Sequence, residues 1–170
     1  LELYYPLSEN NKDKSGYSKD GLGYSIKPGM PGYKGCSTYF PGPFNSISFD
    51  GTDDYINNNY AIAEIKSISF WVNPSSVSQK TMFYISSSIY IEINSSAQIN
   101  AQNFSSPTIY VNASNSTTTL SSSNWYHITV TTNSGITTDN PFYIGRGSSN
   151  YLNGKISEVR IYNTKLLSTE

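Results

Sequence analysis

The sequence predicts an all-β protein folded as a sandwich or barrel of short strands. Its apolar clusters are short, β-branched or aromatic, end at Gly, Pro, Asn or Ser, and show no helical or heptad period. Aromatic residues make up 14% of the chain, with 15 tyrosines, a composition that favours strands and turns over helices. Because 170 residues is the usual length of one domain, we expect a single domain over residues 1–170.

The first strands are predicted from apolar runs that end at a proline or an Asp-Gly turn. Residues 1–7 form a strand that a proline cuts short, and the Gly-, Ser-, Lys- and Pro-rich residues 10–35 form a long irregular connection. The turn at residues 50–54 joins strands at 44–49 and 55–56.

A central strand is predicted at residues 65–72. Ile68, Phe70 and Val72 alternate onto one face, and Pro74 ends the strand because proline cannot donate to a ladder. The same pattern predicts strands at residues 82–85, 89–93, 108–111, 125–131, 142–144 and 156–162. Turns between the later strands are marked by Gly135, Gly145, Gly147 and Gly154.

The strand at residues 89–93 carries the candidate ligand-binding residues. Its three isoleucines lie on one face, which places Tyr90 and Glu92 on the other. An aromatic ring packs on the C–H face of a sugar, and a polar group bonds its hydroxyls, so Tyr90 and Glu92 are the predicted glycan contacts.

Charge and cysteine content exclude several functions. With a net charge of −1 and 14% charged residues, the chain has no basic field for nucleic acid or anionic lipid. It also contains no apolar run near the roughly 20 residues of a membrane-spanning helix. One cysteine, Cys36, and one histidine, His127, supply neither an intrachain disulfide nor a structural zinc site. We expect Cys36 to be a small buried residue or a partly exposed thiol, with an intermolecular disulfide as the alternative.

Several separated segments carry a more specific pattern. In the C-terminal third these are residues 125–131 (WYHITVT), 142–146 (FYIGR) and 151–162 (YLNGKISEVRIY). Upstream they are residues 5–7 (YPL), 13–16 (DKSG), 47–56 (ISFDGTDDYI) and 67–72 (SISFWV). In this order they resemble the laminin G-like domains of the concanavalin A-like lectin/glucanase superfamily. The resemblance covers nearly the whole chain and implies a jelly-roll β-sandwich of two antiparallel sheets, with Trp71 and Trp125 in its core.

One segment departs from the family's pattern. Family members often place a strand like Tyr110-Val111-Asn112, followed by Gly, after the Trp-His strand. Here the segment precedes Trp125, and Ala113 stands in place of the Gly. The resemblance therefore assigns no ligand site to the surrounding loops.

The acidic residues do not form a catalytic pair, so we predict that the chain is not an enzyme. Glycan-hydrolysing relatives place alternate acids along one strand, because two carboxyl groups must flank the glycosidic bond. Glu92 is alone in its strand, and Asp53 and Asp54 are adjacent, so in a strand they would point to opposite faces. His127 follows no nucleophile motif, and we expect it to make a hydrogen bond within the sheet or at its edge.

The turn at residues 50–54 is the candidate metal site. Asp50, Asp53 and Asp54 offer the oxygen ligands that calcium prefers, and some relatives of this fold bind calcium. The competing interpretation is structural, because Asp and Gly are also the residues of any tight turn. We expect no required cofactor, with calcium as the one optional ion.

Four Asn-x-Ser/Thr sequons are candidate glycosylation sites: Asn94, Asn103, Asn112 and Asn115. The chain begins at Leu1 rather than Met, which we expect of a processed mature protein or of a domain excised from a longer one. Both origins are compatible with an extracellular, cell-surface or virion-surface location.

Two functions fit these features. The first is a non-catalytic surface or particle component, such as an adhesin-like, filament or virion decoration subunit, that self-associates or contacts other surface proteins. The alternative is a carbohydrate-binding module that is excised from a larger protein, binding its glycan either with or without the help of calcium.

Overall fold

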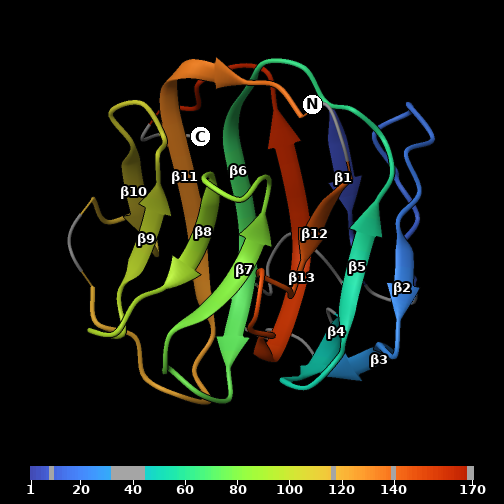
Figure 1. The fold of residues 1–170 in the computed structure, drawn as a ribbon, viewed down its shortest axis with the longest axis vertical. Coiled ribbons are helices and arrows are strands. Elements are labelled where there is room, and N and C mark those ends of the chain that lie inside the picture. The colour runs from blue at the N-terminus through green and yellow to red at the C-terminus, as the bar shows by residue number, and fades with distance from the viewer. Residues whose placement is uncertain (8–9, 32–44, 116–117, 139–140, 168–170) are drawn as a thin grey trace, which may run out of the picture.

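Two antiparallel sheets form the layers of a sandwich in the computed structural model, which describes residues 1–7, 10–31, 45–115, 118–138 and 141–167 (Figure 1). In spatial order, sheet A consists of β10 (Thr108–Val111), β11 (Tyr126–Ile136), β6 (Ile65–Pro74), β13 (Asn153–Tyr162), β4 (Asn45–Asp50) and β3 (Lys27–Pro31), with β1 (Leu3–Tyr5) also paired to β13. Sheet B consists of β2 (Leu22–Tyr24), β5 (Tyr55–Asn58), β12 (Phe142–Ile144), β7 (Lys80–Tyr84), β8 (Tyr90–Ile93) and β9 (Ile99–Gln102). The predicted all-β class and the two antiparallel sheets are confirmed.

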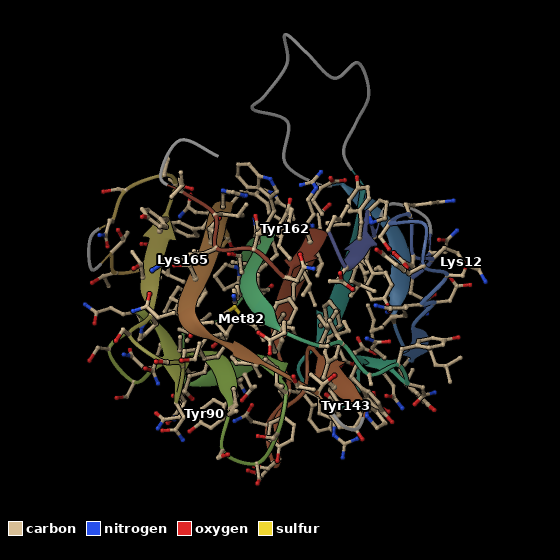
Figure 2. The ribbon with its side chains drawn as sticks, turned by 90° about the horizontal axis from the view of Figure 1, so that it is seen from above. Lys12, Met82, Tyr90, Tyr143, Tyr162 and Lys165 are labelled. Carbon is tan, nitrogen blue, oxygen red and sulfur yellow. The ribbon has the colours of Figure 1, made fainter. Side chains whose placement is uncertain are left out.

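The core lies between the two sheets. Ile68, Phe70 and Val72 of β6 are buried, as their alternation predicts, and Phe70 meets Phe83 of sheet B with ring centroids 4.7 Å apart. Figure 2 shows Met82 in the interior, between the two layers. Apolar side chains from both inner faces thus form one continuous cluster, which stabilises the sandwich by removing apolar surface from water.

The middle of sheet A joins distant parts of the chain. One edge of β13 pairs with β6 along most of its length. Its other edge is shared, with Asn153–Ile156 opposite β4 and Val159–Ile161 opposite β1. The first described strand is therefore fixed to the last.

Several sequence predictions in the loops are corrected. The segment 10–35 was expected to hold little regular structure, but two sheet strands, β2 and β3, lie within it. Edge strands pair on one side only and need no apolar alternation, so their sequence carries a weak signal. The strand β9 was not predicted, and Gly135 and Gly154, expected in turns, lie inside β11 and β13. Cys36 lies outside the described residues.

A polar network orders the loop that leads into β2. Asp13 accepts backbone bonds from Tyr4 at 3.0 Å, Ser15 at 2.8 Å and Lys19 at 2.9 Å. Burial acts to raise the pKa of Asp13, but these bonds favour the carboxylate, and the pKa lies below its usual value. The Tyr5 hydroxyl also donates to the Lys19 carbonyl, at 2.5 Å. The network anchors the loop to β1 beside the core.

No helix among the described residues is long and apolar enough to cross a membrane.

Candidate functional site

A cross-strand row of polar and aromatic residues crosses the outer face of sheet B. Tyr143 of β12 lies opposite Asn57 on one side and Tyr84 on the other. Tyr84 in turn lies opposite Tyr90, and Tyr90 opposite Gln102. Strand alternation places each of these side chains away from the core, because its neighbours in sequence point inward. Three tyrosines therefore stand side by side on three adjacent strands.

The position of this row is visible in Figure 2, where Tyr90 and Tyr143 lie on the same side of the sandwich. Tyr162 lies on the opposite side, with sheet A. The two outer faces of the molecule are thus distinct surfaces.

A second group of tyrosines adjoins the row. Tyr24 of β2 and Tyr55 of β5 are opposite each other and stack with centroids 4.5 Å apart and an interplanar angle of 11°. Tyr55 also meets Tyr143 edge-on at 5.7 Å, and Tyr151 at 6.4 Å. We call the outer surface formed by these side chains the tyrosine face; its members are Tyr24, Tyr55, Tyr84, Tyr90, Tyr143, Tyr151 and Arg146.

Arg146 lies among three of these rings. Its guanidinium carbon is 4.9 Å from the centroid of Tyr55, 5.0 Å from Tyr143 and 5.9 Å from Tyr151. At these distances the cation is attracted to the negative faces of the rings. The three rings therefore hold the Arg146 side chain on the outer face of sheet B.

A tight hairpin aims Arg146 and Tyr151 at the tyrosine face. Gly145 has a φ of +85°, and an added Cβ would lie 2.4 Å from the ring of Phe49, so the position requires glycine. Gly147 donates to the Asn150 carbonyl at 2.8 Å, and Leu152 donates to the Gly145 carbonyl at 2.8 Å. These bonds close the hairpin that follows β12.

The two predicted glycan contacts have different surroundings. Tyr90 is half-buried in the cross-strand row. Glu92 is on the same face but only 5% exposed, and its two oxygens accept bonds from Gln79 at 3.0 Å and Asn100 at 3.1 Å. The Glu92 carboxylate thus ties neighbouring strands together, while the Tyr90 ring remains accessible.

The acidic turn brings the predicted calcium ligands together. Carboxylate oxygens of Asp50, Asp53 and Asp54 lie within 4.8 Å of one another, because Asp50 ends β4 and the chain turns back through Asp53 and Asp54. Asp54 accepts the Asp50 N–H at 2.8 Å, and Asp50 accepts the Thr52 N–H at 2.7 Å. Burial, with the negative charges of Asp50 and Asp53, raises the pKa of Asp54. The carboxylates therefore both shape the turn and offer oxygens to a cation.

A hollow of about 440 Å³ lies on the outer face of sheet A, lined by Trp71, Asn112, Ala113, Trp125 and His127. Both tryptophans were expected in the core, which is wrong: they are half-buried at the surface. Trp71 follows the inward Phe70, so alternation turns it outward, where its ring lies 5.0 Å from that of His127. Ala113 has a φ of 64°, the left-handed backbone that the family's glycine would favour.

His127 makes a hydrogen bond within the sheet. Its Nε2 lies 2.9 Å from the Ser69 hydroxyl, and its backbone N–H donates to the Asn112 side chain at 2.9 Å. Burial, aided by the positive charge of Arg160, lowers the pKa of His127. The histidine is thus neutral at pH 7 and bonded to its own sheet.

The four sequon asparagines differ in their contacts. Asn94 is half-buried and accepts backbone bonds from Ser96 and Gln98. Asn103 is exposed, but its amide nitrogen donates to the Ser88 carbonyl at 2.8 Å. Asn112 and Asn115 are exposed, and Asn115 lines a hollow of about 280 Å³ beside β9 and β10.

The fold and the site define a jelly-roll β-sandwich with an aromatic outer face. A family model described as the concanavalin A-like lectin/glucanases superfamily matches residues 49–138, more than half of the chain, and the chain belongs to this family. The comparisons with curated proteins and with solved structures gave no match.

Sequence reasoning found Tyr90 but not the rest of the tyrosine face. Tyr143 stands between two apolar residues of one strand, so alternation alone marks it as outward. Its contact with Tyr55 and Tyr84 depends on the register of strands distant in sequence, and no local pattern encodes that register. The position of Arg146 depends in addition on the hairpin at Gly145.

Proposed function

We propose that the chain is a non-catalytic binding domain that holds a carbohydrate chain on its tyrosine face. One observation supports this most directly: Tyr143, Tyr84 and Tyr90 form a single cross-strand row beside the stacked pair Tyr24 and Tyr55. Tyrosine offers an apolar ring face together with a hydroxyl, and sugars offer C–H faces together with hydroxyls. Adjacent strands lie about 4.8 Å apart, so the row spans about 10 Å, and an extended chain contacts several rings at once.

The absence of catalysis in this proposal has two supports. Laminin G-like lectin-fold domains are generally non-catalytic. On the tyrosine face, Glu92 has both oxygens bonded to neighbouring side chains, and its strand places no second acid at an alternate position. Glycoside hydrolysis needs two carboxyl groups on either side of the bond.

Calcium at the acidic turn is the second part of this proposal. The turn adjoins the stacked tyrosines, because Tyr55 follows Asp54 directly and Asp53 accepts a bond from Ser25, next to Tyr24, at 3.4 Å. Three carboxylates supply part of the six to eight or so oxygens that calcium takes. A bound ion would therefore hold the ends of β2 and β5 together, and binding measured with calcium and with a chelator tests this part.

Affinity electrophoresis through gels that contain dissolved polysaccharides tests the binding itself. We expect Tyr143→Ala to weaken binding about tenfold, since it removes a central ring worth about 1.4 kcal/mol. The matched control is Tyr162→Ala, which removes a half-buried tyrosine from the opposite side of the sandwich. Equal losses in both variants, or no retardation of the wild type by any polysaccharide, would contradict the proposal.

A surface or particle component remains the second candidate, and β2 favours it. This strand ends sheet B, and all three of its residues are exposed, with Leu22 at 51% and Tyr24 at 42%. An uncovered edge strand offers backbone groups to a further strand. In this role the chain is an extracellular adhesin-like, filament or virion decoration subunit that joins copies of itself or other surface proteins.

A further inference from the structure

We infer that the ligand of the tyrosine face is an acidic glycan, and that Arg146 binds its anionic group. This inference rests on the proposed function and names the class of carbohydrate. It depends on the position of one arginine, on its missing partner and on the geometry of a guanidinium group.

The chain contains two arginines, and both lie over tyrosine rings. Arg160, on sheet A, lies 4.6 Å from the centroid of Tyr4 and pairs with the carboxylate of Glu158 at 2.5 Å. Arg146 lies over three rings, and none of the carboxylates in the described part of the chain pairs with it. The same type of aromatic support thus holds one cation that is neutralised within the fold and one that is not.

The N–H donors of the Arg146 guanidinium make no hydrogen bond to a side chain among the described residues. A guanidinium is planar, with five N–H donors in the plane and π-type contacts on its faces. The guanidinium carbon lies 4.9 and 5.0 Å from two ring centroids, and no side chain in the described part of the chain accepts a hydrogen bond from it. The in-plane donors match the two oxygens of a carboxylate or a sulfate, which they bind as a bidentate pair.

The surroundings strengthen such a pair. Arg146 is half-buried among tyrosines, where a charge pair is less screened than in open water. The rings and the hairpin already restrict the side chain, so little further freedom is lost when an anion binds. Neighbouring tyrosines contact the sugar ring that carries the acid, which places both kinds of contact within one ligand.

Two sources of the anion share this chemistry, a uronate carboxylate and a sulfate ester. The test uses pairs of probes that share a polysaccharide backbone and differ in charge: polygalacturonate against its methyl ester, and dextran sulfate against dextran. Wild type, Arg146→Gln, Arg146→Lys and the control Lys155→Gln are compared for each probe. Lys155→Gln removes the same charge from the outer face of sheet A. Circular dichroism and thermal unfolding establish that each variant is folded.

We expect the wild type to bind one acidic probe about tenfold more tightly than its neutral partner, a preference that weakens as salt is added. Arg146→Gln removes this preference by lowering the binding of the acidic probe about tenfold, to the level of its neutral partner; Arg146→Lys keeps part of the preference, and Lys155→Gln keeps all of it. Equal binding of acidic and neutral probes by the wild type overturns this inference and leaves the proposed function standing. The inference is also overturned, with the proposed function still standing, if Arg146→Gln weakens the binding of acidic and neutral probes equally. Arg146 would then only support the tyrosine rings. If no probe binds the wild type, the proposed function fails as well.

Discussion

At the scale of single residues, the tyrosine face depends on a backbone position that carries no functional group. Gly145 turns the chain sharply after β12, and Arg146 follows it onto the outer surface. Phe49 of sheet A fills the space where a side chain at Gly145 would lie. One glycine thus connects the packing of the core to the placement of the cation.

Gly145→Ala is expected to lower the free energy of unfolding by about 2 to 5 kcal/mol, the sum of left-handed strain and a clash with Phe49. The matched control is Gly16→Ala, where φ is also positive, at +98°, but no atom lies within 4 Å of the added Cβ. That variant should lose only about 1 to 2 kcal/mol. Urea unfolding of both proteins measures the difference, and equal losses would show that Phe49 does not restrict this position.

At the scale of strands, alternation in the sequence predicted the long core strands well. Residues 65–72 and 89–93 match β6 and β8 because the apolar side chains that alternate along each stretch pack in the core, which imposes period two on a local stretch. The strand β9 was missed because its four residues include Asn100 and Gln102, which face outward, and only Ile99 and Ala101 mark the core side. Edge strands lack the signal for a related reason: β2 buries none of its side chains.

The exposed edge of β2 makes a prediction about assembly. If β2 joins copies of the chain, Leu22→Lys should shift the protein toward the monomer, because a charge on an edge strand opposes pairing with another strand. Leu1→Lys is the control, since Leu1 is also exposed, at 43%, but lies outside the strands. Sedimentation velocity over a range of concentrations measures the shift. If the wild type stays monomeric at every concentration, the chain does not self-associate through β2.

At the scale of the whole molecule, the pH dependence of stability just below neutral pH is expected to come from one side chain. His127 is the only histidine, and histidine is the side chain that ordinarily titrates in this range. Burial and Arg160 lower its pKa in the folded state, so the unfolded chain binds the proton more readily. Below the ordinary pKa of 6.5, the free energy of unfolding should therefore fall as pH falls. At more acidic pH, protonation of Asp13 removes a further contribution, because its pKa is lowered in the fold.

His127→Gln tests the origin of the first loss. Glutamine can still bond Ser69 but takes up no proton, so stability should become flat between pH 7 and the range where carboxylates titrate. Thermal unfolding at a series of pH values gives the comparison. An unchanged slope in the variant would mean that another group titrates in this window.

The pairing of β1 with β13 also determines how the chain must fold. Leu3 lies opposite Ile161, so β1 is made long before the strand that it pairs with. Until β13 emerges, the side chains of Leu3 and Tyr5, both fully buried in the finished sandwich, remain in contact with water. Contacts between such distant residues close slowly, and an apolar strand that waits for its partner is open to pairing with other chains. The same pairing then holds β1 against β13 once folding is complete, so β1 leaves the sheet only when its bonds to β13 break.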